Sequence, residues 1–369
     1  MRIHGRELAQ AELEAYAGDA AAAGGVREVE LSDGAERGIR VLEFTTAGGL
    51  RFESMIDRAM DIGVAEYRGV GVGWRSPSGF RHPGLHETDS EEGLSLFRSM
   101  SGLVVTAGLD HTLFGDRTEA AHYAYPPRTH VQHTLHGRVG NIPARLSGYG
   151  TRWDGDRAVL WAEGEIRQAA VFGEHLRLTR RIEAPLDGSE IRLIDVVRNH
   201  GFERTPHMFL YHVNVGWPLL EEGARFEAPV RETTWRSDSV GSQGADEKVM
   251  AAPRPGFVEQ VYQHGLDADS EGRTRAAVVN DRLGLRFELD FSTREFPWFF
   301  EWLSLRAGSY AIGLEPSTHA VAGDNAARAD GTMIWLEHGE ERRYETVFRF
   351  AASGALAGDY REAEVDGGR

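Results

Sequence analysis

The chain of 369 residues contains no cysteine. This excludes a disulfide framework, a thiolate nucleophile and a thiolate metal site. The sequence also lacks any run of about 18 apolar residues that could span a membrane. Its charged N-terminus has no apolar stretch of the kind found in a secretory signal. These absences predict a cytoplasmic protein that does not bind membranes.

Basic residues are outnumbered, with 41 Lys and Arg against 57 Asp and Glu and a formal net charge of -16. The field of such a chain repels phosphate backbones and anionic lipids. We therefore expect neither nucleic acid nor a membrane as partner. The charge favours a neutral or cationic small ligand over a multiply charged anion.

Several familiar motifs and boundaries are also missing. There is no Walker-type phosphate loop and no Gly-x-Ser-x-Gly element, and the glycine run at 69–73 is not followed by a helical pattern, so it predicts a turn. No Pro/Ser-rich linker divides the chain. We expect a single domain over 1–369, with a core at roughly 26–351 and a flexible C-terminal tail at 352–369.

The segment Gly5–Ala23 is rich in helix formers and predicts one short N-terminal helix. From Val26 onward, apolar and polar residues alternate between turn signals, which is typical of antiparallel strands with one buried side. The clearest such segments are Ala158–Gly164, His175–Ile182, Glu190–Val197, Leu283–Phe291 and Glu341–Phe350. No strand–helix rhythm appears, so the fold class is mainly β, a large antiparallel sandwich. Loops are expected at 76–92, 115–133, 238–254 and 319–331.

Two apolar strand patterns contain polar residues that indicate a wet cavity. In Phe209-Leu-Tyr-His-Val-Asn-Val-Gly-Trp-Pro, His212 and Asn214 point to the same side of the strand. Glu315 ends a second apolar strand just before Pro316, where burial would raise its proton affinity and suit it to act as a general base. The alternatives are a core histidine bonded to a backbone carbonyl and a glutamate paired with an arginine.

Histidines 130, 133 and 136 are three residues apart, so on a strand successive ones point to opposite faces. That run alone does not predict a metal site. A site that adds His111, His207 or His212 stays open, but our predicted site contains no metal and no cofactor.

Two further clusters are candidates for substrate contacts. Arg58 and Asp61 form a candidate hydroxyl-binding pair, for which a structural ion pair is the alternative. Trp298 and Trp302 belong to an aromatic cluster that could offer a stacking platform for a sugar, although core packing is the more common use of such residues.

Three of these motifs resemble those of the aldose 1-epimerases, the galactose mutarotases. Leu135-His-Gly-Arg-Val-Gly-Asn-Ile-Pro-Ala resembles their Leu-His-Gly element, Tyr211-His-Val-Asn-Val-Gly-Trp-Pro their second histidine strand, and Ile312-Gly-Leu-Glu-Pro-Ser-Thr the strand that carries their catalytic glutamate. Residues 57–63, 102–110 and the Trp298 region look closer to a less characterised, aldose-1-epimerase-like branch of the superfamily whose function is unknown.

The resemblance implies a β-supersandwich with a sugar cleft, and a role for each matched residue. Glu315 would take the proton of the anomeric hydroxyl, His212 would protonate the ring oxygen, and His136 would hydrogen-bond the substrate near that oxygen. A carboxylate and an imidazole can perform this chemistry without a metal or redox cofactor.

This chain departs from the family pattern in its substrate-binding residues. The family's substrate-binding arginine is absent at 107–111, and Arg58, Arg138 or His111 would replace it. No clear match exists for the aspartate that binds sugar hydroxyls. Other sugar epimerase, isomerase or lyase-like activities, one of them metal-assisted, and a non-catalytic carbohydrate-binding role are the alternatives. A homodimer is a further expectation.

Overall fold

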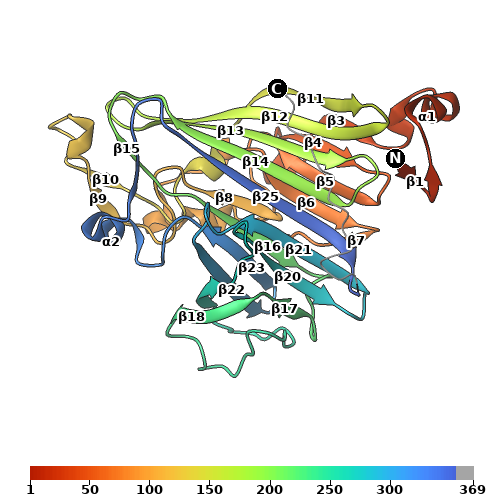
Figure 1. The fold of residues 1–369 in the computed structure, drawn as a ribbon. Helices are drawn as coiled ribbons and strands as arrows, with labels where there is room; N and C mark the ends of the chain where they lie inside the picture. The colour runs from red at the N-terminus through yellow and green to blue at the C-terminus, as the bar shows by residue number, and fades with distance from the viewer. Residues whose placement is uncertain (355–369) are drawn as a thin grey trace.

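Three large antiparallel sheets form the fold, and the computed structural model describes residues 1–354 of it (Figure 1). The largest sheet has eight strands. In spatial order they are β11 (Arg145–Asp154), β12 (Arg157–Ala169), β13 (His175–Pro185), β14 (Glu190–Asn199), β25 (Glu341–Ala352), β21 (Leu285–Ser292), β20 (Arg273–Asn280) and β17 (Arg225–Glu227). All five alternating segments of the sequence lie in this sheet, and its neighbouring strands pair antiparallel, as predicted.

The other two large sheets form the opposite layer. The six-stranded sheet has the order β18 (Val230–Arg236), β19 (Gln260–Leu266), β22 (Trp298–Arg306), β23 (Ser309–Ser317), β16 (Leu210–Gly216) and β8 (Val104–Ala107). The five-stranded sheet has the order β3 (Gly25–Glu30), β4 (Arg40–Thr45), β5 (Leu50–Met55), β6 (Asp61–Tyr67) and β7 (Val70–Gly71). The two sheets meet where the Trp74 amide donates to the Asn214 carbonyl at 3.0 Å.

The core lies between the layers. One apolar cluster contains buried side chains from all three sheets, among them Phe52, Leu178 and Val213. Strict alternation along β13 and β14 directs every second side chain into it. The predicted mainly-β antiparallel sandwich is therefore confirmed.

Three two-stranded ladders and two α-helices complete the described fold. The ladders pair β1 (Arg2–Ile3) with β2 (Arg6–Glu7), β9 (Arg117–Glu119) with β10 (His130–Gln132), and β15 (Thr205–His207) with β24 (Ile334–Leu336). The predicted N-terminal helix is present as α1 (Gln10–Ala17). None of the helices in residues 1–354 has the length and apolar character needed to cross a membrane.

The prediction of loops at 115–133 and 319–331 was wrong in part. The first contains β9 and β10, and the second contains α2 (Gly323–Asp330). Alanines favour the helix, Arg328 pairs with Asp324 one turn earlier, and Gly331, at φ 77°, adopts the left-handed conformation that ends many helices. The segment is too short for its apolar periodicity to be recognised. The expected tail at 352–369 lies outside the described residues from 355 onward.

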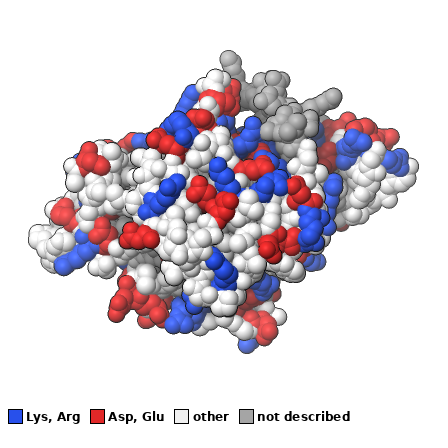
Figure 2. Space-filling model, turned by 90° about the horizontal axis from the view of Figure 1, so that it is seen from below, with Lys and Arg blue, Asp and Glu red and all other residues white. Residues whose placement is uncertain are grey.

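Charged side chains are distributed over the surface without separation by sign in the view from below. Figure 2 shows acidic and basic groups interspersed on that face. There the net charge of -16 is not gathered into one patch.

A buried arginine connects the two layers. Arg180 on β13 is fully buried and contacts Asp195 on β14 at 2.6 Å and Asp61 on β6 at 2.7 Å. It also donates to the hydroxyl of Thr106 on β8 at 2.8 Å, and the hydroxyl of Tyr211 on β16 donates to Asp195 at 2.6 Å. This network connects β8 and β16 to the eight-stranded sheet across the core.

Candidate functional site

Strands β16 and β23 bring a histidine and a glutamate together from positions far apart in the sequence. Their antiparallel register pairs Val213 with Leu314, which places His212 directly across from Glu315 on the face opposite to the core. His212 Nε2 lies 3.1 Å from Glu315 Oε1, and both residues are 4% exposed. The structure therefore brings His212 and Glu315 together, as the sequence analysis expected.

Gly313 leaves the space that this pair needs. It lies two residues before Glu315 on the same face, and a methyl group there would sit 2.8 Å from Glu315 Oε1 and 2.9 Å from His212 Cε1. Both distances are too short, so the carboxylate and the imidazole would have to move.

We expect Gly313→Ala to misalign the pair rather than unfold the sheet. A displacement of about 1 Å at a reacting group can reduce turnover roughly 10²-fold. The measurements on the purified variant are thermal unfolding and the rate of the anomer exchange that the family resemblance implies. A variant with wild-type turnover would contradict this packing argument.

His136 approaches the pair from the loop that follows β10. Its ring lies edge-to-face with that of His212, with centroids 5.4 Å apart. The Leu113 amide donates to His136 Nδ1 at 3.3 Å, so the ring proton resides on Nε2. His136 adopts a left-handed backbone at φ 60°, which is uncommon for a residue other than glycine and a mark of a constrained position. All three predicted catalytic residues therefore lie together.

Tryptophans border the pair. The Trp302 ring centroid is 5.3 Å from that of His212 and 5.7 Å from that of Trp74, and Trp302 Nε1 donates to Glu259 at 2.7 Å. Trp298 lies on the same face of β22, four residues from Trp302. Both β22 tryptophans are partly exposed, so the apolar border of the site reaches solvent. Trp302, rather than the predicted Trp298, contacts the imidazole.

Burial dominates the electrostatics of the three groups. It raises the pKa of Glu315 well above its usual value, with a further contribution from the charge of Glu259. It lowers the pKa of His212 well below that of a free imidazole, and His136 adds to the shift. The pKa of His136 falls to about 3 because of burial and the neighbouring His111. Burial therefore disfavours the charged form of each of the three groups.

Two predicted substrate-binding residues, Asn214 and Arg138, form hydrogen bonds within the protein. Asn214, beside His212, donates to the His212 carbonyl at 3.1 Å, and its buried side-chain oxygen has no partner among the described residues. Arg138 pairs with Asp89 at 3.0 Å and donates to the Gln132 carbonyl at 3.0 Å. Asn214 is thus fully buried beside His212, and Arg138 is bound to its own loop.

The structure does not pair Arg58 with Asp61 as a hydroxyl-binding unit. Both Asp61 oxygens are engaged, since one binds Arg180 and the hydroxyl of Thr106 and the other accepts from the Thr106 amide. The arginine partner of Asp61 is therefore Arg180: Asp61 does form a structural ion pair, but not the one with Arg58 that the sequence suggested. Arg58 donates to the Gly140 carbonyl at 3.3 Å and keeps one buried nitrogen without a partner within residues 1–354.

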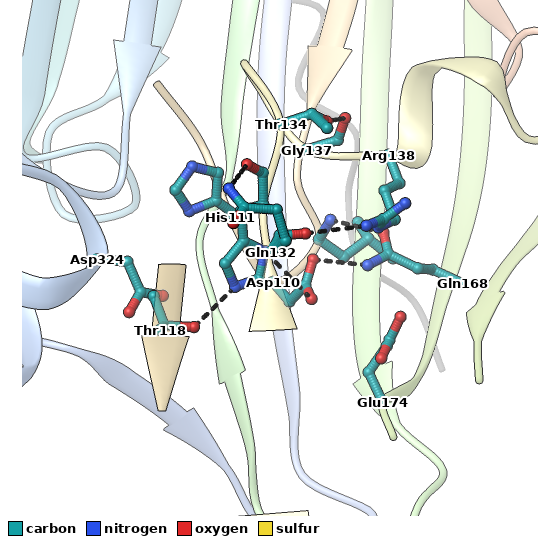
Figure 3. Close-up of polar contacts among 12 residues, drawn as sticks. Asp110, His111, Thr118, Gln132, Thr134, Gly137, Arg138, Gln168, Glu174 and Asp324 are labelled. Carbon is teal, nitrogen blue, oxygen red and sulfur yellow. Dashed lines mark hydrogen bonds and ion pairs between the residues drawn. The ribbon is translucent and has the colours of Figure 1, made fainter. Parts of the chain in front are cut away.

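His111 lies in a different cluster from the one predicted. It stacks on His133, with ring centroids 4.5 Å apart, next to Asp324 of α2 (Figure 3). It remains connected to the candidate site through the 111–113 backbone, which supplies the amide bound by His136.

Comparison with known proteins identifies the family. The sequence profile of a family described as "Domain of unknown function (DUF4432)" matches residues 36–350. The chain belongs to this family. No curated protein sequence matches the chain.

Solved structures show that this DUF4432 member has the galactose mutarotase-like fold. A candidate aldose 1-epimerase from Klebsiella pneumoniae matches with a TM-score of 0.79 and 24% identity over 89% of this chain and 83% of its own. A galactose mutarotase-like protein from Clostridium acetobutylicum matches with a TM-score of 0.59 and 13% identity over 89% and 98%. Galactose 1-epimerase from Lactobacillus acidophilus matches with a TM-score of 0.54 and 12% identity over 89% and 99%. At these identities the likeness establishes the fold alone, and the predicted supersandwich is confirmed.

The DUF4432 chain contains a second histidine–glutamate pair that our sequence analysis missed. His264 Nε2 lies 3.1 Å from Glu301 Oε2, and both residues are buried. The side chains of His264 on β19 and Glu301 on β22 point to the core side of the six-stranded sheet. Side chains alternate along a strand, and those of Val261, Gln263 and Trp302 point to the other side. Alternation in Gln260–Leu266 could have revealed His264, but not its partner.

Proposed function

We propose that this protein interconverts the anomers of an aldose or a modified sugar by acid–base opening and reclosure of the ring. The observation that carries this proposal is the 3.1 Å contact between His212 and Glu315 beside Trp302, with His136 edge-on to His212. The galactose mutarotase-like fold supports it. The substrate-binding roles of Arg58, Arg138 and Asn214 remain part of the proposal, as does a small carbohydrate as ligand.

One proton shared by the pair is sufficient for the reaction. Burial disfavours a net charge, and moving the proton across 3.1 Å converts a neutral acid and imidazole into carboxylate and imidazolium. In the second form, Glu315 accepts the proton of the anomeric hydroxyl while His212 gives its proton to the ring oxygen. The bond from the anomeric carbon to the ring oxygen breaks, and an open-chain aldehyde forms.

Reclosure reverses the proton movements. Rotation about the first carbon–carbon bond presents the other face of the aldehyde to the hydroxyl that becomes the ring oxygen. That hydroxyl returns its proton to His212, and the new anomeric hydroxyl receives one from Glu315. His136, with its proton on Nε2, donates a hydrogen bond near the ring oxygen, and the Trp302 face packs against the apolar side of the sugar.

Exchange spectroscopy by NMR on a panel of aldoses tests the proposal. We expect exchange between anomers faster than in buffer for at least one sugar. Calorimetry on the same panel separates catalysis from binding alone. A sugar that binds without accelerated exchange would support the non-catalytic alternative, and no accelerated exchange on any sugar would refute the proposed activity.

The pH profile offers a sharper check. Burial lowers the pKa of His212 and raises that of Glu315, and between these two values the pair holds one proton. It gains a second proton only below the lowered His212 value and loses its single proton only above the raised Glu315 value. We expect the alkaline limb of kcat/KM, after subtraction of the buffer rate, not to follow the titration of a free imidazole near about 6.5. An alkaline loss centred there would indicate an independent imidazolium acid.

A further inference from the structure

Three buried side chains from separate segments meet beside the candidate site. His111 lies between β8 and β9, His133 follows β10, and Asp324 belongs to α2, with exposed fractions of 0%, 3% and 0%. One potential ligand atom from each lies within 4.8 Å of those of the other two. Figure 3 shows Asp324 and Thr118 on one side of His111 and Asp110, Gln168 and Glu174 on the other.

Two atoms in this cluster have unused binding capacity. His111 Nε2 donates to the Phe114 carbonyl at 2.6 Å, so His111 Nδ1 carries a lone pair, and it has no partner among the described residues. Asp324 Oδ1 pairs with Arg328, whereas Asp324 Oδ2 has no partner within the same residues. A buried polar atom left unsatisfied is costly, so two of them in one cluster indicate a missing ligand.

We propose that His111, His133 and Asp324 bind a divalent transition-metal ion of the Zn²⁺ class. Two imidazoles and one carboxylate form a common zinc-binding set, and imidazole ligands argue against Mg²⁺ and Ca²⁺. In a tetrahedral zinc site, neighbouring ligand atoms lie about 3.4 Å apart, so a bound ion would draw these side chains slightly closer. This proposal departs from our expectation of no metal.

The surroundings of His133 fit this role. Its Nε2 lies 3.0 Å from the hydroxyl of Thr118, an oxygen that could complete the coordination. Its Nδ1 lies 3.9 Å from Asp110, whose carboxylate accepts from Gln168 at 2.6 Å. A carboxylate behind a metal-bound histidine is the usual means of orienting the ring.

A metal here would connect three separate segments of the fold to the proposed sugar site. It would join the 108–114 segment, the β9–β10 ladder and α2. His136 follows His133 by three residues, and the amide that fixes its ring belongs to Leu113, two residues after His111. The ion would therefore act as a positioning element for His136, outside the reacting pair.

Zinc binding by the full chain tests the proposal without any sugar. After removal of metal with a chelator, calorimetric titration with ZnCl₂ and elemental analysis should give about one ion per chain. Asp324→Asn should weaken Zn²⁺ binding by more than the 10–100-fold typical of an outer-shell change. Matched controls are Asp330→Asn on the same helix and the exposed His130→Ala on β10, both of which should bind like wild type.

Absence of stoichiometric zinc in the wild type, or equal affinity in Asp324→Asn, would overturn the assignment. If Asp324→Asn fails to fold, X-ray absorption of zinc-loaded wild type decides, because two imidazoles with an oxygen ligand support the site and fewer than two refute it. These outcomes do not depend on anomer exchange, so they separate this inference from the proposed function.

Discussion

Glu315→Gln is expected to lower kcat/KM for anomer exchange by about 10²–10⁴-fold. Glutamine keeps the volume of the side chain, but it cannot accept the proton of the anomeric hydroxyl. In the proposed mechanism Glu315 and His212 act as a unit, so His212→Gln added to Glu315→Gln should cost little more than either change alone. Exchange spectroscopy on a sugar accepted by the wild type provides the rates.

Glu301→Gln is the matched control. Glu301 is an equally buried glutamate on the same sheet, and it contacts His264 at the same 3.1 Å as Glu315 contacts His212. It faces the core, so its replacement should leave kcat/KM within a few-fold of wild type. Equal losses in the two variants would mean that the loss reflects damage to the sheet, and a fully active Glu315→Gln would remove Glu315 from the mechanism.

Alternation along the chain was sufficient to predict the sheets and to place His212 and Asn214 on one side of a strand. It could also mark Glu315 as a carboxylate at the end of an apolar strand. It could not predict that β16 pairs with β23 in the register that places His212 opposite Glu315. Register depends on the packing of whole sheets, and a shift by one residue would move either side chain to the opposite face. In the sequence analysis, the family resemblance was what assigned His212 and Glu315 to one site.

The partners of buried charges were the least predictable part. Asp61 was expected to act with Arg58, three residues away, but its partner is Arg180, which lies 119 residues along the chain. Arg180 falls in an alternating strand at a position that the pattern reserves for an apolar side chain. A local pattern shows that a charge is buried, but only tertiary packing selects the opposite charge that makes its burial tolerable.

His111 illustrates the same limit at the candidate site. The sequence placed it among substrate contacts because it occupies the segment where the resembling family has an arginine. Its neighbours His133 and Asp324 come from two other segments, both of which were expected to be loops. The fold of α2 places Asp324 beside His111, and no local sequence pattern predicts that contact.

Asp195→Asn should reduce the free energy of unfolding by about 3–5 kcal/mol, the largest stability effect that we expect from one substitution. Asp195 binds Arg180 through two oxygens, at 2.6 and 2.9 Å, and accepts from Tyr211 at 2.6 Å, with no exposure to solvent. The amide leaves the fully buried guanidinium with Asp61 as its one charged partner within residues 1–354. Denaturant unfolding with a comparable m-value gives the difference.

The surface pair Arg177–Glu165 supplies the control for this prediction. Arg177 lies on β13 with Arg180 and contacts Glu165 at 2.8 Å, but both side chains are about a quarter exposed, at 27% and 24%. Glu165→Gln should cost no more than about 1 kcal/mol, because water solvates the arginine that remains. Tyr211→Phe should fall between the two, since it removes one hydrogen bond to a charged group and leaves the ion pair intact. If Asp195→Asn proved as mild as Glu165→Gln, the Arg180 network would not be what holds β8 and β16 against the eight-stranded sheet.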